Sequence, residues 1–338
     1  MNLNFFKNKK IIVTGGTGLI GAKICNYFSK IHADVSSVSI DSDERVKKVL
    51  LKPEIHKNID LRNFNDCLSL FKDADIVINL MGIRESTQLG VKKSATAMSA
   101  FLICNTNIIQ ASCKNSVKTY LFCGSINEYP PLEVRREDDL WNGLPSANDK
   151  YVGVSKRVGE LQAEAYSKQF NWDAVKIVRP SNVYGPLDNF DPETAHVIPS
   201  LIHKIFNQNE GELKVAGDGK AIRDFIFIDD LVDGILRVIE KGDTNLPFNL
   251  GSGVGVSIRE VVETILEFTN SKIKIVWDND LPTGDKKRIL DISRAKEKIN
   301  FMPKHSLSQG IKKTIEWYLK NTDLAYKYGR TYDKKYKI

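Results

Sequence analysis

Three glycines near the start of the chain have the spacing of a loop that binds a phosphate group. Gly15, Gly18 and Gly21 follow the apolar run KIIVT at residues 10–14. Glycine lets backbone amides approach a pyrophosphate closely, and the first turn of a following helix directs its N–H groups at the negative charge. We therefore predict a dinucleotide-binding loop, which also includes Thr17, Leu19 and Ile20.

An acidic residue about 20 positions after such a loop can select the cofactor. Asp41 ends the run DVSSVSID at 34–41, where its carboxylate could bond the ribose hydroxyls of an adenosine. A carboxylate repels a 2′-phosphate, so Asp41 favours NAD over NADP, and the alternative for Asp41 is a simple turn residue. The nearby Arg45 and Lys47 weaken the preference for NAD.

The elements that must position these residues alternate between strand and helix. Strands are predicted at 10–14, 34–41, a short run ending at Asp60, 74–82, a run that emerges at Ser125, and 173–180. This alternation predicts an α/β fold, a Rossmann-type doubly wound parallel sheet with helices on both faces. The strand ends of such a sheet face the cofactor, which makes further candidates of Asp60, Leu61, Leu80, Met81 and Gly82.

Two regions are expected along the chain. Residues 1–185 form the NAD-binding Rossmann domain, with the strand 173–180 included, and residues 186–338 form mainly a smaller, mixed substrate-binding lobe. Within the second region, 220–250 is expected to return to the main sheet, and 229–240 reads as a structural amphipathic helix. A substrate would lie in the cleft between the two regions.

Composition narrows the class of protein. The chain has 338 residues, 42% of them hydrophobic and 27% charged, and no run of about 18 apolar residues, so it reads as a globular protein without a membrane span. The net charge of +7 is scattered, densest in the C-terminal KYGRTYDKKYKI, which predicts a solvated tail rather than a nucleic-acid or membrane surface. The five cysteines lack CxxC spacing, which indicates reduced thiols in the cytoplasm, and no metal site is predicted.

Several motifs spread over nearly the whole chain resemble one superfamily. They are TGGTGLIG at 14–21, DLR at 60–62, NLMG at 79–82, GS at 124–125, SKR at 155–157 and RPSNVYGP at 179–186. Together they resemble the extended short-chain dehydrogenase/reductases, which include the nucleotide-sugar epimerases, dehydratases and reductases. The segments YGPLDNFDPETAHVIPSLIHK and LPTGDKKRILDISRA are most similar to GDP-L-fucose synthases and related GDP-sugar enzymes.

The resemblance implies hydride transfer at C4 of the sugar. Ser125 matches the serine that holds the C4 oxygen, and without the resemblance it would read as a strand-end cap. Lys156 matches the lysine that binds the nicotinamide ribose and lowers the pKa of a neighbouring tyrosine, which handles the hydroxyl proton. These matches imply a cytoplasmic, NAD-dependent enzyme that acts on a nucleotide sugar.

The tyrosine departs from the pattern. The family spacing is Y-x-x-x-K, but Tyr151 lies five residues before Lys156, and Val152 occupies the usual position. Two readings stay open. In one, which is slightly favoured, Tyr151 lies at a non-helical N-terminus or bulge and still reaches the site. In the other, Ser125, a water or another residue handles the proton.

A second departure concerns proton exchange at carbon. In GDP-L-fucose synthases a cysteine and a histidine epimerise C3 and C5; His196 matches the histidine, but Asn127 stands where the cysteine would be. An amide is no base near neutral pH, so this epimerisation is not expected. His196 is left either as a substrate-binding residue or as a residue at a helix start.

Further substrate contacts follow from the resemblance. Arg223 matches an arginine that contacts the substrate diphosphate, and a guanidinium pairs bidentately with phosphate oxygens. Asn182 could bond the sugar or its diphosphate, and Val183 could pack on the nicotinamide. The remaining candidates are Lys204, Arg288 and Asn127. Without the resemblance, the cationic residues would read as surface charges.

The predicted function is NAD-dependent oxidation and reduction at C4 of a GDP-linked sugar, as dehydrogenation or as 4-epimerisation through a 4-keto intermediate. One alternative is an NADPH-dependent GDP-4-keto-6-deoxy-sugar reductase/epimerase of the fucose-synthase type. Another is a catalytically impaired protein that binds NAD or a nucleotide. In the family, the helices expected at about 93–114 and 153–169 form a four-helix bundle across a two-fold axis, so a homodimer is expected.

Overall fold

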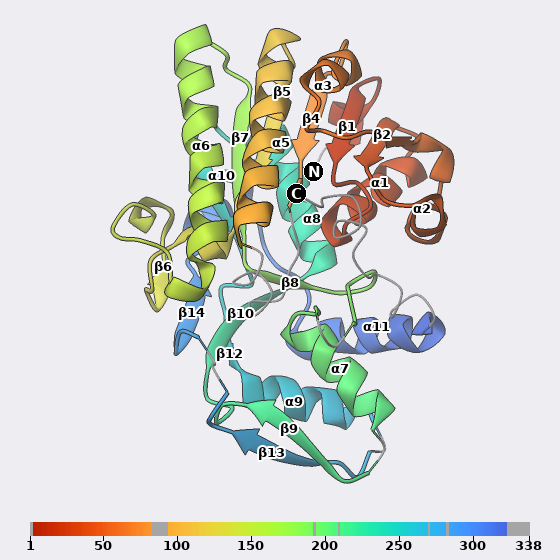
Figure 1. Cartoon of the computed structure of the whole chain (residues 1–338), viewed down its shortest axis with the longest axis vertical. Coiled ribbons are helices and arrows are strands. Elements are labelled where there is room, and N and C mark those ends of the chain that lie inside the picture. The colour runs from red at the N-terminus through yellow and green to blue at the C-terminus, as the bar shows by residue number, and fades with distance from the viewer. Residues whose placement is uncertain are drawn as a thin grey trace.

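A parallel sheet forms the larger part of the molecule (Figure 1). The computed structural model describes residues 3–82, 94–191, 194–208, 210–269, 271–281 and 284–322. Among these residues the main sheet has the strand order β11-β7-β5-β4-β1-β2-β3, and every neighbouring pair is parallel. Its strands are β1 (Lys10–Thr14), β2 (Asp34–Ser39), β3 (His56–Asn58), β4 (Ile76–Asn79), β5 (Thr119–Cys123), β7 (Val175–Pro180) and β11 (Pro247–Leu250).

Helices cover both faces of this sheet, as the sequence predicts. Side chains alternate along a strand, so Ile11 and Val13 of β1 join one hydrophobic core while Ile12 joins the other. The first core includes residues of α1 (Leu19–Lys30), α2 (Asp43–Val49) and α8 (Ile228–Lys241). The second includes residues of α3 (Phe64–Leu70), α5 (Ser94–Lys114) and α6 (Lys150–Phe170). The doubly wound architecture is therefore confirmed.

A second sheet lies beyond the carboxyl ends of the main strands. Its order is β12-β10-β14-β6, and β8 also pairs with β10. The strands are β6 (Val134–Arg135), β8 (Asn182–Tyr184), β10 (Ile222–Phe227), β12 (Gly255–Ser257) and β14 (Lys287–Leu290). A separate pair joins β9 (Glu212–Ala216) to β13 (Lys274–Asp278). The smaller lobe is completed by α7 (Val197–Asn207), α9 (Ile258–Glu267), α10 (Ser293–Ile299) and α11 (Leu307–Lys320).

Two expectations about the organisation need correction. The stretch 220–250 does not return to the main sheet as a whole, because β10 belongs to the second sheet and only α8 and β11 pack with or join the first. The second sheet also draws β6 and β8 from before residue 185, so that boundary does not separate the two sheets. The reason is that short strands without a clear alternating pattern take their partners from tertiary packing.

The strand order reverses between β1 and β4, and this point positions the site. Connections from neighbouring strands leave in opposite directions at such a switch point, which opens a crevice at the carboxyl ends of the strands. The glycine loop follows β1, Leu80 follows β4 and Ser125 follows β5. The predicted cofactor and reaction residues therefore meet at one edge of the sheet.

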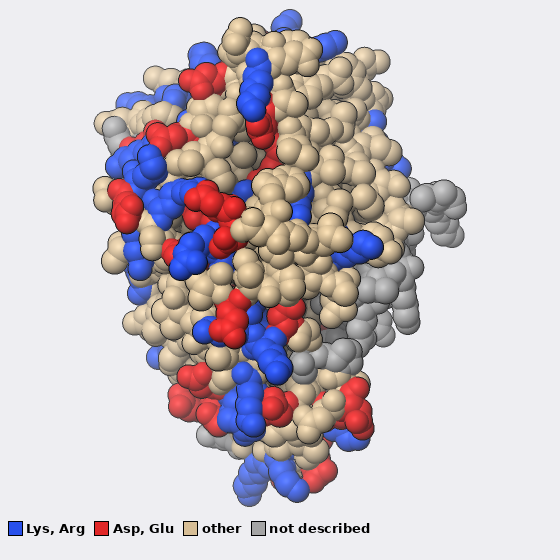
Figure 2. All heavy atoms as spheres, turned by 90° about the vertical axis from the view of Figure 1, so that its left-hand side faces the viewer, with Lys and Arg blue, Asp and Glu red and all other residues tan. Residues whose placement is uncertain are grey.

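Charge is mixed over the face seen in Figure 2, where basic and acidic side chains interleave without a patch of one sign. The basic C-terminal run at 327–338 lies outside the described residues. Within the part of the chain that is described, no helix combines the length and the apolar character needed to cross a membrane.

Candidate active site

The glycine loop is built so that only backbone lies at its centre. Gly15 has a positive φ of 67°, and a Cβ there would lie 2.8 Å from the carbonyl oxygen of Leu80. A Cβ on Gly21 would lie 2.2 Å from the carbonyl oxygen of Gly15. Gly18 is the N-cap of α1 and supplies no side-chain acceptor to the first turn of that helix. The loop therefore presents backbone N–H groups and a positive helix end, which fits the pyrophosphate of a dinucleotide.

Asp41 reaches back to this loop from just beyond β2. The hydroxyl of Thr17 donates to its carboxylate, and Thr17 is buried, with 2% of its surface exposed. Arg45 holds both partners, with Nε 3.3 Å from Asp41 Oδ2 and Nη2 donating to the Thr17 carbonyl at 3.0 Å. The carboxylate that favours NAD is thus paired with a cation that could accept a 2′-phosphate.

The remaining predicted cofactor residues lie at neighbouring strand ends. Asp60 lies two residues beyond β3, and its carboxylate accepts from Arg62 Nη2 at 2.6 Å, while the next residue, Leu61, is buried. Leu80 is half-buried beside Gly15, and Gly82 is exposed just after β4. Of these residues Leu80 is shown next to the glycine loop, and the cofactor roles of all four stay predictions.

A buried asparagine that sequence reasoning missed holds the end of β4 in place. Asn79 accepts from the Thr14 hydroxyl at 3.0 Å and from the Met81 backbone N–H at 3.1 Å, and it donates to Asn105 Oδ1 at 2.7 Å. It is 1% exposed. A polar residue at the end of the otherwise apolar run IVIN was the signal that could have identified it.

Ser125 follows the end of β5, and the Lys156 ammonium binds backbone carbonyls at the ends of β4 and β5. Ser125 caps the short helix Ile126–Glu128, and its Oγ accepts from the Asn127 backbone N–H at 3.1 Å. Lys156 Nζ donates to the carbonyl of Cys123 at 2.6 Å and to that of Met81 at 3.4 Å. Burial lowers the pKa of Lys156, so its ammonium gives up a proton more readily than that of an exposed lysine.

Tyr151 does not lie at a non-helical terminus, and the first of the two readings above is wrong on that point. It is the second residue of the helix α6, and its carbonyl accepts from the Ser155 hydroxyl at 2.7 Å, a helical i to i+4 contact. Five residues along a helix rotate a side chain by about 140°, so Tyr151 and Lys156 point in different directions. Tyr151 is 46% exposed.

Asn127 belongs to a cluster of charged side chains that comes together from distant parts of the chain. Its Oδ1 accepts from Arg288 Nη1 at 3.1 Å, and Arg288 Nη2 binds Asp149 at 2.8 Å and Asp285 at 3.0 Å. The fully buried Arg135 donates to Asp285 at 2.7 Å. The sequence offered little local signal for this cluster, because its contacts mostly join distant positions: Asn127 to Arg288, Asp149 to Arg288, and Arg135 to Asp285. Only Asp285 and Arg288 lie close together in the chain.

Arg223 lies beside Arg288 on the neighbouring strand. The two residues are register partners of β10 and β14. Burial, and next the charge of Arg288, lower the pKa of Arg223 to about 10. Two adjacent guanidinium groups that raise each other's energy form a site that an anion would stabilise. The role of Arg223 toward a diphosphate stays a prediction.

The other predicted substrate residues lie on two different elements. Asn182 and Val183 are half-buried in β8, where Asn182 Nδ2 donates to the Asp224 carbonyl at 2.7 Å. His196 is the exposed N-cap of α7, and Lys204 is half-buried further along that helix. Their roles toward a substrate stay predictions.

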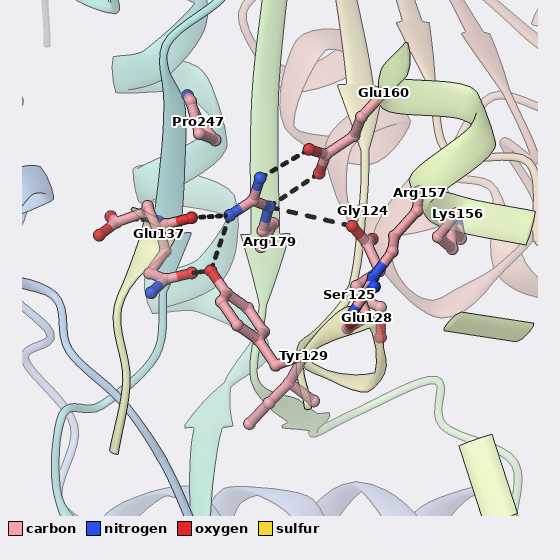
Figure 3. Close-up of polar contacts among 12 residues, drawn as sticks. Gly124, Ser125, Glu128, Tyr129, Glu137, Lys156, Arg157, Glu160, Arg179 and Pro247 are labelled. Carbon is pink, nitrogen blue, oxygen red and sulfur yellow. Dashed lines mark hydrogen bonds and ion pairs between the residues drawn. The ribbon is translucent and has the colours of Figure 1, made fainter. Parts of the chain in front are cut away.

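Glu128 lies just after Asn127 but points into the protein. Figure 3 shows its carboxyl group next to Arg179 and Glu160, on the inner side of the segment that carries Ser125. The side chain is fully buried. Its carboxyl group therefore lies inside the protein rather than at the surface.

The family model described as NAD dependent epimerase/dehydratase family matches residues 11–251. A putative GDP-L-fucose synthase 2 from Arabidopsis thaliana is 31% identical over 324 residues, which cover 93% of each chain. A dTDP-4-dehydro-6-deoxy-D-allose reductase from a Streptomyces species is 28% identical over 327 residues, 94% of this chain and 98% of that protein.

Solved structures agree on the fold. A UDP-glucose 4-epimerase from Thermotoga maritima superposes with a TM-score of 0.81 at 25% identity, covering 93% of this chain and 99% of its own. A GDP-L-fucose synthetase from Naegleria fowleri, bound to NADP, has a TM-score of 0.80 at 24% identity, with 95% and 96% covered. With the glycine loop and the Ser125–Lys156 pair in place, the chain belongs to the NAD dependent epimerase/dehydratase family.

Proposed function

We propose that this protein transfers a hydride to or from C4 of a sugar linked to guanosine diphosphate. The single observation that carries the proposal is that the Lys156 ammonium binds the Cys123 carbonyl, two residues before Ser125, at the same end of the sheet as the glycine loop. The relatives named as GDP-L-fucose synthases support the guanosine nucleotide. The nicotinamide cofactor, when bound, would supply or accept the hydride.

The residues of the chain divide the remaining work. Ser125 would hold the C4 oxygen by donating a hydrogen bond, while Lys156 stabilises the negative charge that develops there. A lysine has three N–H donors, and among the described residues two of them have partners, Cys123 and Met81. The third donor is available for the ribose or for the sugar oxygen. With Tyr151 turned away, we propose that the ammonium of Lys156 takes over the proton transfer.

Arg223 would bind the diphosphate, and Asn127 would orient the sugar. Arg288 fixes Asn127 through its Oδ1, so the amide presents N–H donors to whatever lies beside it. An N–H donor can bind a hydroxyl or keto oxygen but cannot remove a proton from carbon. We therefore propose reaction at C4 without epimerisation at C3 and C5.

We propose NAD as the cofactor, with an NADPH-dependent GDP-4-keto-6-deoxy-sugar reductase as the second candidate. Asp41 favours NAD because its carboxylate repels a 2′-phosphate. The ion pair between Asp41 and Arg45 favours the second candidate, since Arg45 could turn to a 2′-phosphate. Calorimetric titration with NAD and NADP decides between them: tighter binding of NADP would overturn the choice of NAD.

The function is tested by nicotinamide absorbance with GDP-, UDP- and dTDP-linked hexoses and 4-keto hexoses. We expect turnover with GDP-linked sugars, and a loss of about 10²- to 10⁴-fold in Lys156→Met, as for removal of a general acid. Preference for a UDP- or dTDP-sugar would overturn the nucleotide assignment. Cofactor binding without any sugar-dependent change would instead support a nucleotide-binding protein without activity.

A homodimer is proposed from the outer surface of α5 and α6. These long helices pack against each other, and they leave Ile103, Leu161 and Phe170 about half exposed, at 46%, 47% and 54%. Large exposed apolar side chains on neighbouring helices are typical of a subunit interface. A monomeric mass by light scattering at micromolar concentration would contradict the proposal.

A further inference from the structure

Glu128 is fully buried, yet no donor of the described residues forms a hydrogen bond with either oxygen of its carboxyl group. The nearest cation is Arg179, whose Nε lies 3.9 Å from Glu128 Oε2. Arg179 instead binds Glu160 through two short contacts, Nε to Oε1 at 2.8 Å and Nη2 to Oε2 at 2.6 Å (Figure 3). Arg179 therefore pairs more closely with Glu160 than with Glu128.

The carboxyl groups of Glu128 and Glu160 both lie next to Gly124. A Cβ on this glycine would lie 2.5 Å from Glu128 Oε1 and 3.0 Å from Glu160 Oε1, so both oxygens occupy the space next to one backbone atom. Two carboxylates close together in a buried site disfavour each other's ionised form. Burial, and next the charge of Glu160, raise the pKa of Glu128 well above its ordinary value, which favours the protonated form of Glu128.

Lys156 lies on the same stretch of backbone. Its Nζ binds the carbonyl of Cys123, the residue before Gly124, and the ionisable groups that raise its pKa are the Cys123 thiol, Glu128 and Glu160. The other ionisable groups around Glu128 are Arg157, which donates to the Glu128 carbonyl at 2.7 Å, Tyr129, Glu137 and Arg179. Within the described chain, none of the three cations Lys156, Arg157 and Arg179 forms a hydrogen bond with the Glu128 carboxyl group.

We propose that Glu128 and Glu160 hold one proton between them beside Lys156, and that loss of this proton at high pH keeps the lysine charged. When the proton leaves Glu128 for solvent, the pair gains one negative charge, which favours the ammonium form of Lys156. Glu128 is thus a positioning residue that acts through Lys156. The consequence for catalysis rests on the proposed function of Lys156, whereas the shared proton does not.

The shared proton is tested by infrared spectroscopy of the whole protein. We expect a band of a protonated carboxyl group at neutral pH that is lost in Glu128→Gln and retained in the matched control Glu164→Gln, which changes an exposed glutamate of the same helix as Glu160. Absence of a difference between wild type and Glu128→Gln at neutral pH would overturn the proposal.

The effect on Lys156 is tested by its titration in ¹⁵N-lysine NMR spectra, with Lys156→Arg to assign the signal, and by the pH profile of hydride transfer. In Glu128→Gln and Glu128→Leu the lysine should lose its proton at lower pH, because neither side chain can ionise. The alkaline limb of the pH profile should also move to lower pH. At pH values above this limb the rate of hydride transfer should be about tenfold lower than in the wild type, which is part of the roughly 10²- to 10⁴-fold that acid catalysis contributes. An unmoved lysine titration in both variants would refute the coupling.

The readouts separate two kinds of failure. If the lysine titration moves but no sugar is turned over, the proposed function is wrong and the proton-sharing pair stands. Stability offers a check on folding. The unfolded chain loses the Glu128 proton above about pH 4.3 while the folded protein keeps it, so the stability of the wild type should fall relative to Glu128→Gln as the pH rises from there to the raised pKa. Equal pH dependence in the two proteins would contradict the shared proton.

Discussion

The glycine loop follows β1 of the main sheet, whereas the Asn127–Arg288 cluster links the segment after β5 to β14 of the second sheet, and the two are assembled in different ways. The loop is formed by backbone atoms of residues 15–21, which are consecutive in the sequence. The cluster uses side chains from four separate segments, and the contact between Asn127 and Arg288 spans 161 positions. A site made of local backbone geometry leaves a pattern in the sequence, while a site made of long-range ion pairs leaves none.

The largest expected effect comes from breaking the cluster. Arg288→Met should destabilise the protein by about 3–5 kcal/mol, because Asp149 and Asp285 would lose a partner in a site where they are only 12% and 17% exposed. Urea unfolding measures the change. The control Lys298→Met removes an exposed pair with Asp243 and should cost much less stability, because water screens the two charges. Equal losses in the two variants would show that burial does not distinguish them.

Arg223 separates anion binding from the structural role of its neighbour. Arg223→Ala should raise the KM for the nucleotide sugar by about 10- to 100-fold, the loss expected for a charged hydrogen bond to phosphate, with little change in kcat. Steady-state kinetics with the active sugar measures this. Arg237→Ala, which removes an arginine paired with Asp233 on α8, serves as the matched control. An unchanged KM in Arg223→Ala would show that Arg223 does not bind the diphosphate.

The glycine loop is tested by adding a single methyl group at Gly21. Gly21→Ala should cost about 1–3 kcal/mol in cofactor binding, because its Cβ would meet the Gly15 carbonyl oxygen at 2.2 Å and displace the loop. Isothermal titration with the cofactor gives the difference. Gly82→Ala is the comparison, since the nearest atom to its Cβ is 3.9 Å away and the fold should tolerate it. Normal cofactor affinity in Gly21→Ala would mean that the loop relaxes without loss.

The smallest effect is expected at Tyr151. Tyr151→Phe should change turnover by no more than about twofold, which corresponds to the roughly 0.5 kcal/mol typical of surface substitutions. The hydroxyl points away from Lys156 on an exposed part of α6, so its loss removes no contact of the proposed site. A loss of a hundredfold or more at constant folding stability would restore the tyrosine as the proton donor.

Predictions from the sequence succeeded where periodicity and glycine spacing act over short distances. The strands of the main sheet, the helices at 94–114 and 228–241, and the edge shared by Gly15, Leu80 and Ser125 agree with them. They failed for β10, which joins the second sheet, and for the start of α6, which is helical from Lys150. In both places the outcome depends on packing against distant segments, which local propensity does not contain.

The amino-acid sequence by itself determined the doubly wound fold, the phosphate-binding loop and the identity of Ser125, Lys156, Asn127 and Arg223 as candidates. Only the tertiary structure decided that Tyr151 turns away from Lys156, that Arg288 is held by Asp149 and Asp285, and that Glu128 shares a buried site with Glu160. The physical reason is that backbone geometry is set by neighbours in sequence, whereas the burial and charge of a side chain are set by neighbours in space.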